Sequence, residues 1–169
     1  MQEWGSTFST YIMGTDNLTN RQEEASYGGN NWIFNSRSGQ SEIQGRPFKW
    51  NWKTPYVRGG NKIPLFADTM WRGGGPFYQN GDYRSDRIKP PQYDGQWNNY
   101  NSEMMHFCID RHNGFVNHVF MDCTVRKVGL KELWTLKWHK EFDINGFWTK
   151  AGGADPSDWP EWMRKFKDY

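Results

Sequence analysis

The most regular pattern of apolar and polar positions lies in residues 104–139. Two apolar-rich runs of strand length, 104–109 and 115–121, flank a turn segment that contains Asn113-Gly114. Asn-Gly favours a tight hairpin because both residues tolerate a positive φ angle. Residues 124–128 then resume the strand pattern with polar residues interleaved. The sequence therefore predicts a small three-stranded antiparallel meander in this region.

Helical spacing follows the meander. Gly129 frees the backbone to turn, and apolar residues then recur at helical spacing, which predicts an amphipathic helix. These residues are Leu130, Leu133, Trp134, Trp138 and Phe142. A short final helix is also expected, with Asp155 before Pro156, or Asp158 before Pro160, as its N-cap. Its apolar stripe would consist of Trp159, Trp162, Met163 and Phe166.

Less regular patterning occupies the rest of the chain. Short apolar runs at 32–34 and 63–68 predict two further strands, and Pro64 suits the start or edge of a strand because it cannot donate a hydrogen bond. Residues 71–102 are rich in Gly, Pro, Asn, Asp and Tyr, which predicts a long, irregular loop. We expect one α+β domain over residues 1–169. Its parts are a weakly patterned segment (1–24), a sheet with loops and a helix (25–142) and a tail with a short helix (143–169).

The composition limits the classes of function. A formal net charge of +2 gives no electrostatic argument for binding nucleic acid or an anionic membrane. The sequence given has no apolar run long enough to span a bilayer. Two cysteines, Cys108 and Cys123, are too few for a disulfide framework, and we expect both to be free thiols. By contrast, 18% aromatic residues, including 11 Trp, indicate extensive contact surfaces.

Motifs for chemistry are weak. The four histidines (His106, His112, His118 and His139) lack metal-binding spacing, and no serine-nucleophile motif is present. Asp68, Asp110 and Asp122 could form a carboxylate pair on paper, but acidic residues in turns usually bond local backbone N–H groups. Residues 80–86 resemble a fragment of a calcium loop, although the full twelve-residue spacing is missing. We therefore expect no catalytic residue, no metal site and no cofactor, with calcium at 80–86 the one candidate exception.

Aromatic residues in the loops form the main candidate binding surface. Such side chains can stack on sugar rings or on a neighbouring protein, and they can equally cover the sheet in place of aliphatic residues. The sequence leaves both interpretations open. The residues concerned are Trp50, Trp52, Tyr56, Trp71, Tyr78, Tyr83, Tyr93 and Trp97.

His112 and Asp122 are separated by nine residues. We interpret His112 as structural, an imidazole in a turn that bonds a carboxylate or carbonyl group, with Asp122 as the expected partner. The spacing resembles the H-X9-DG signature near the C-terminus of bacterial prepilin-like proteins, with Cys123 in the place of the glycine. The segments after Cys123 resemble the endings of type II secretion pseudopilin-like proteins of planctomycete-type bacteria. Residues 26–32 and 61–68 are similar to upstream blocks of the same group.

This resemblance implies a fold and a role. The family has a hydrophobic N-terminal helix, which anchors the precursor in the inner membrane, and a pilin-like head with an antiparallel sheet and C-terminal helices. That helix is absent from the sequence given, so we expect a head trimmed of its anchor. The implied function is a non-enzymatic subunit of a secretion- or surface-associated filament, in the periplasm or at the cell surface. Its partners would be copies of itself or other pseudopilins.

In this interpretation, the residues of the signature have a structural role. We expect His112, Asn113, Gly114 and Asp122 to shape the hairpin that holds the C-terminal helix in place. A carbohydrate-binding module that uses the Trp and Tyr loops is the alternative function.

Overall fold

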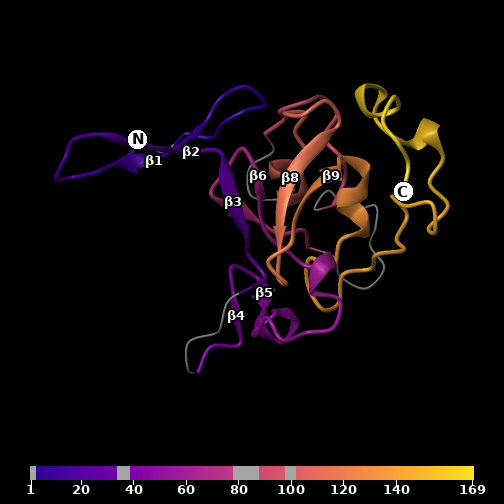
Figure 1. Cartoon of the computed structure of the whole chain (residues 1–169), viewed down its shortest axis with the longest axis horizontal. Coiled ribbons are helices and arrows are strands. Elements are labelled where there is room, and N and C mark those ends of the chain that lie inside the picture. Colours follow the sequence, from indigo (N-terminus) through magenta and orange to yellow (C-terminus); the bar gives the residue numbers. More distant parts are fainter. Residues whose placement is uncertain (1–2, 34–38, 78–87, 98–101) are drawn as a thin grey trace.

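The computed structural model describes residues 3–33, 39–77, 88–97 and 102–169, and strands dominate these parts (Figure 1). The main sheet has five strands in the order β7-β3-β6-β8-β9. All its neighbouring pairs are antiparallel except β3 and β7, which are parallel. The strands are β3 (Tyr27–Asn30), β6 (Pro64–Asp68), β7 (Gly73–Gly74), β8 (Phe115–Phe120) and β9 (Val125–Gly129).

Two small hairpins accompany this mixed sheet. Strands β1 (Tyr11–Thr15) and β2 (Gln22–Ala25) pair antiparallel and project away from the sheet (Figure 1). Their turn is closed by Asp16, whose Oδ1 accepts hydrogen bonds from the backbone N–H groups of Leu18 and Thr19 at 3.0 and 2.6 Å. The second hairpin joins β4 (Glu42–Ile43) to β5 (Arg46–Pro47).

The α+β class expected from the sequence is wrong. The helical parts of the described residues are short 3₁₀ turns, and none of them reaches seven residues. They are η1 (Phe48–Trp50), η2 (Gly60–Lys62), η3 (Glu103–His106), η4 (Lys131–Thr135), η5 (Pro156–Asp158) and η6 (Glu161–Met163). The C-terminal helices of a pilin-like head are therefore not formed, and the fold is mainly β.

The helix expected from Leu130 is replaced by the short turn η4. The chain becomes extended at Leu136, and two of the following N–H groups bond to distant segments instead of to the preceding turn. Lys137 N–H donates to Lys62 O at 2.8 Å, and Lys140 N–H donates to Trp50 O at 3.0 Å. The apolar residues of this stretch are all buried, so their helical spacing reflects burial on several sides rather than one amphipathic face.

The hairpin expected across Asn113-Gly114 is also wrong, because only the second of its two predicted strands is formed. Residues 104–109 are buried, but they form η3 and an irregular continuation instead of a strand. Strand β8 instead pairs with β6 on one side and with β9 on the other, the latter as expected. Asn113 and Gly114 do adopt positive φ angles, 54° and 87°, as the sequence predicted.

Two other predicted elements can be compared with the structure. Strand β6 is confirmed, with Pro64 as its first residue. The strand predicted at 32–34 is not found there, and the nearest strand is β3, which ends at Asn30. Trp32 is fully buried in the turn after β3, and residue 34 lies outside the described parts.

The C-terminal tail keeps the predicted cap without the predicted helix. Asp155 and Asp158 form a capping box around η5, and Pro156 occupies its first position. Trp159 and Met163 are buried, while Trp162 and Phe166 are partly buried against the same core. The tail therefore packs on the domain through the residues that the sequence indicated, in two short turns.

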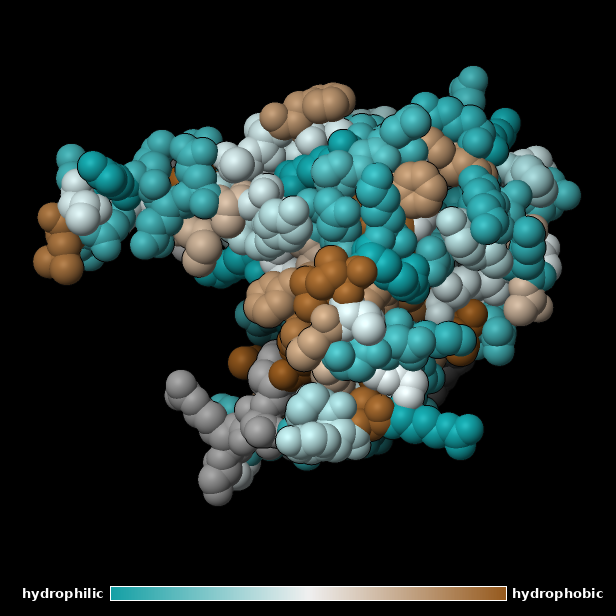
Figure 2. Space-filling view, viewed as in Figure 1, coloured by the Kyte–Doolittle hydropathy of each residue, from teal (hydrophilic) through white to brown (hydrophobic). Residues whose placement is uncertain are grey.

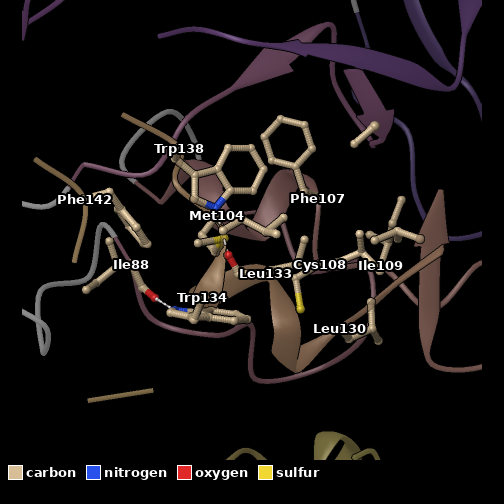
Figure 3. Packing of buried hydrophobic residues seen from close by; sticks show 14 of the residues in the cluster. Ile88, Met104, Phe107, Cys108, Ile109, Leu130, Leu133, Trp134, Trp138 and Phe142 are labelled. Atoms are coloured by element: carbon tan, nitrogen blue, oxygen red, sulfur yellow. Dashed lines mark hydrogen bonds between the residues drawn. The ribbon is translucent and has the colours of Figure 1, made fainter. Parts of the chain in front are cut away.

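The hydrophobic core lies between the sheet, η3, η4 and the tail (Figure 3). Two of the Trp side chains in this core donate hydrogen bonds to buried carbonyl groups. Trp134 Nε1 donates to Ile88 O at 2.7 Å, and Trp138 Nε1 donates to Leu133 O at 2.8 Å. Cys108 is buried in this core and Cys123 is exposed, and both are free thiols, as expected. Burial raises the pKa of the Cys108 thiol well above its usual value. Among the described residues, none of the helical turns has the length and apolar character to cross a membrane.

Candidate functional site

His112 bonds to Asp68 and not to Asp122. Its Nε2 atom lies 3.0 Å from Asp68 Oδ2 and 2.9 Å from Asn117 Nδ2. Asp68 is buried at the end of β6, and its Oδ2 also accepts the Asn117 backbone N–H at 2.6 Å. His112 thus faces a carboxylate, but the expected partner Asp122 is wrong, because the carboxylate comes from the neighbouring strand β6. The two groups tie the start of β8 to the end of β6.

Asp122 instead stabilises the turn between β8 and β9. Its Oδ1 accepts hydrogen bonds from the Thr124 N–H at 3.0 Å and the Thr124 hydroxyl at 2.7 Å. The Thr124 side chain and backbone together lower the pKa of the Asp122 carboxyl. Cys123 completes the turn with a φ angle of 67°, in the left-handed region that favours glycine. A tight hairpin loop that ends in a left-handed residue is a common way to join two antiparallel strands.

Gly114 lies against the C-terminal tail, and the segment Asn113-Gly114 does not join two paired strands. A Cβ atom built on Gly114 would lie 2.7 Å from Phe166 Cδ1, so only glycine allows this ring to pack so closely. Gly129 has the same relationship to the Tyr169 ring. The Lys150 N–H donates to Tyr169 O at 2.7 Å and fixes the end of the chain. The signature region therefore anchors the tail, although the tail is not a helix.

Of the aromatic residues singled out from the sequence, those that the structure describes do not form one exposed platform. Trp50 packs against the rings of Trp32 and His139, and Trp52 Nε1 donates to Lys137 O at 3.2 Å. Tyr56 and Tyr93 are 93% and 61% exposed, while Trp71 is buried and Trp97 is partly buried. Tyr78, Tyr83 and the calcium-loop candidate at 80–86 lie outside the described residues.

Trp71 lines a pocket of about 470 Å³ that the sequence did not indicate. The pocket lies where the β1–β2 hairpin, the β4–β5 turn, β7 and η3 converge. Most of its lining side chains are polar, and they come from five separate stretches of the chain. The lining residues are Met13, Asn31, Gln44, Trp71, Arg72, Gly73, Glu103 and His106.

A buried ion pair forms one wall of this pocket. Glu103 Oε1 bonds to Arg46 Nη2, and both side chains are almost fully buried. Arg46 Nη1 also donates to Gln44 Oε1 at 2.7 Å, and its guanidinium lies 5.0 Å from the centre of the Phe77 ring. Burial raises the pKa of Glu103, while the charge of Arg46 acts in the opposite direction. Buried ion pairs carry a large desolvation cost, which close contact and further hydrogen bonds such as that from Arg46 to Gln44 offset.

A stack of rings lies beside His106, which also lines the pocket. The Trp97 ring lies between those of Trp4, at 5.3 Å, and His106, at 4.6 Å. His106 is buried, and its Nδ1 atom lies 3.1 Å from Gly73 O. Gly74 allows β7 to approach η3, because an added Cβ atom would lie 2.9 Å from the Phe107 ring and 3.1 Å from Glu103 O. Gly73 allows β7 to approach β3, because its Cβ atom would lie 2.8 Å from Gly29 O. The run of three glycines was the one sequence signal that could have revealed this pocket.

Two of the remaining histidines are buried groups of the core. Burial lowers the pKa values of both His118 and His139 to about 3, so each is a neutral group of the core. The described residues contain no group of three His, Cys, Asp or Glu side chains that could hold a metal ion. Glu103 is the one carboxylate among the residues that line the pocket. This arrangement is suited to binding a polar molecule and lacks the paired carboxylates that hydrolysis of a glycosidic bond usually needs.

Comparison with known proteins adds no assignment. No protein-family model, no curated protein and no solved structure matches this chain.

Proposed function

We propose that this chain is a non-enzymatic structural subunit, the outward-facing part of a pilin-like protein that assembles into a secretion- or surface-associated filament. Its fold would be the mainly β arrangement described above. The proposal rests on the resemblance to H-X9-DG proteins and on the structural roles of the residues that carry it. The subunit would be displayed in the periplasm or at the cell surface, next to copies of itself or other pseudopilins.

The observation that carries the proposal is the His112–Asp68 pair. It joins two of the segments that resemble the family, since Asp68 ends the 61–68 block and His112 begins the signature. The third segment includes β3, which pairs with β6 directly. The similar blocks thus meet in the three central strands of the sheet, where their residues hold the fold together.

The β1–β2 hairpin and the segment before it offer a surface for contacts between subunits. Leu18 at the hairpin tip is 96% exposed, Phe8 is 93% exposed and Trp4 is 57% exposed. Figure 2 shows hydrophobic atoms at the outer end of this projection. Exposed apolar side chains on a projecting element are typical of protein–protein contacts.

Self-association of the purified chain tests the proposal. Sedimentation velocity over a wide concentration range should show reversible association, which the double variant Phe8→Ser/Leu18→Ser weakens. The control is Val125→Ser, because Val125 is also 70% exposed but lies on β9, away from the hairpin. A chain that stays monomeric at every concentration, or that associates equally well in both variants, would contradict the proposed assembly surface.

A further inference from the structure

We propose that the pocket between the β1–β2 hairpin, β7 and η3 binds an acidic sugar, a hexose ring that carries a carboxylate. This binding function is separate from the proposed assembly role, which uses the outer surface of the hairpin. The pocket has a volume of about 470 Å³, within the range of small-ligand sites.

The lining chemistry fits a ring with several hydroxyl groups. Asn31 and Gln44 contribute amide groups, Glu103 contributes a carboxyl group and Arg72 contributes a guanidinium. These planar groups offer both donors and acceptors, so each can engage a different hydroxyl of one ring. Gln44 Oε1 and Glu103 Oε1 already bond to Arg46. An apolar ligand would therefore bury only the remaining donors and acceptors of these groups without partners, at a cost of about 1–3 kcal/mol each.

The charges of the pocket favour an anionic ligand. The negative charge of Glu103 is balanced by Arg46, which is buried beside it. Arg72 is exposed, and it has no ion-pair partner among the residues that the structure describes. Its guanidinium lies 5.4 Å from the centre of the Trp71 ring, which holds the charge against the pocket wall. A planar guanidinium in this setting suits a carboxylate, which it can bind through two parallel hydrogen bonds.

The wall around Arg72 is built in advance of ligand binding. Trp71 is packed against the rings of Tyr11 and Trp97, and the Arg46–Glu103 pair fixes the position of Gln44. Rigid groups lose little conformational freedom on binding, so most of their interaction energy contributes to affinity. The pocket therefore has the order that a selective sugar site requires.

Calorimetric titration of the purified chain with matched pairs of sugars tests the inference. Sodium glucuronate and sodium galacturonate should bind saturably and more tightly than glucose and galactose, and added salt should reduce this preference. Sodium acetate is the control for a carboxylate without a ring, and it should bind far more weakly than either uronate. If none of these sugars binds, or if acetate binds as well as glucuronate, the inference is wrong.

Variants locate the binding to this pocket. Arg72→Gln should weaken uronate binding about tenfold or more and remove the preference over the neutral sugar, because a charge-assisted hydrogen bond is lost. Gln44→Ala, on a separate segment, should weaken acidic and neutral sugars alike. Tyr56→Ala is the control, since Tyr56 is exposed and lies outside the pocket lining. Thermal unfolding confirms that each variant is folded, and unchanged binding in both pocket variants would overturn the assignment.

Discussion

Gly114 lies directly against the Phe166 ring, so that a side chain at position 114 and the native position of the ring exclude each other. The glycine also has a φ angle of 87°, which other residues rarely adopt. Two separate requirements therefore converge on one position of the turn after His112. Glycine is therefore needed here because the C-terminal tail packs against it, and not because the segment forms a hairpin turn.

Gly114→Ala should destabilise the fold by more than backbone strain alone. We expect a loss of about 1–2 kcal/mol for the left-handed φ angle and a further ~1–3 kcal/mol for displacing the Phe166 ring. The matched control is Gly153→Ala, since Gly153 has the same φ angle of 87° but nothing within 4 Å of the added Cβ atom. Urea unfolding of the two variants measures the difference. An equal loss of unfolding free energy in both would show that the Phe166 ring can move aside without destabilising the fold.

His112→Ala should destabilise the protein through Asp68. The substitution leaves a buried carboxylate with fewer partners, which typically costs about 1–3 kcal/mol. Double-mutant cycles by urea unfolding identify the partner. The pair His112→Ala with Asp68→Asn should show a coupling energy of at least 0.5 kcal/mol or so, whereas His112→Ala with Asp122→Ala should be additive. Coupling to Asp122 instead, or no loss of stability in His112→Ala, would contradict the contact.

The sequence predicted local features better than their connections. The positive φ angles at Asn113 and Gly114, the Asp155 cap and the β8–β9 hairpin depend on neighbouring residues, and all of them are present. The partner of His112 depends on β6, which lies about 45 residues earlier in the chain. No local pattern determines which distant strand will lie beside β8.

The failure of the predicted helices has a different cause. Apolar spacing reports which residues are buried, and Leu133 and Trp138 are indeed buried. It does not report whether the backbone N–H groups bond within the segment, and the N–H of Lys137 bonds to Lys62 instead. The pocket was missed for a related reason, because Arg46 and Glu103 are 57 residues apart and form an ion pair only after the chain folds.

Cys123→Gly should stabilise the β8–β9 turn relative to Cys123→Ala. The side chain of Cys123 is exposed, so its removal loses little packing, while glycine relieves the strain of a φ angle of 67°. We expect the glycine variant to exceed the alanine variant by up to about 1 kcal/mol, because the relief of strain exceeds the extra entropy of glycine in the unfolded chain.

Lys127 provides the matched control for this comparison. It is an exposed residue of β9 with ordinary extended backbone, so glycine there should be less stable than alanine by roughly 0.5–1 kcal/mol. The order of the two variants should thus reverse between positions 123 and 127. The same order at both positions would show that the φ angle of Cys123 carries no measurable strain.

Acid should weaken the fold through His118 and His139. Burial lowers both pKa values from the usual 6.5 to about 3, so between these limits the unfolded chain takes up protons that the folded chain does not. The contribution of each histidine to stability is therefore complete above pH 6.5 and falls as the pH drops towards 3, with a slope of up to about 1.4 kcal/mol per pH unit.

Removing one histidine isolates this effect from that of the carboxyl groups. Burial raises the pKa of Glu103, so protonation of Glu103 stabilises the folded state as the pH falls and opposes the effect of the histidines. The change in unfolding free energy from pH 7 to pH 5 is therefore compared between the wild type and each variant. His118→Leu should reduce the loss of unfolding free energy over this interval by about 2 kcal/mol, whatever its effect at pH 7. Arg126 also lowers the pKa of His118, so Arg126→Gln should produce a smaller change of the same sign. Parallel pH profiles for the wild type and His118→Leu would mean that His118 takes up its proton equally in the folded and unfolded states, which contradicts a pKa lowered by burial.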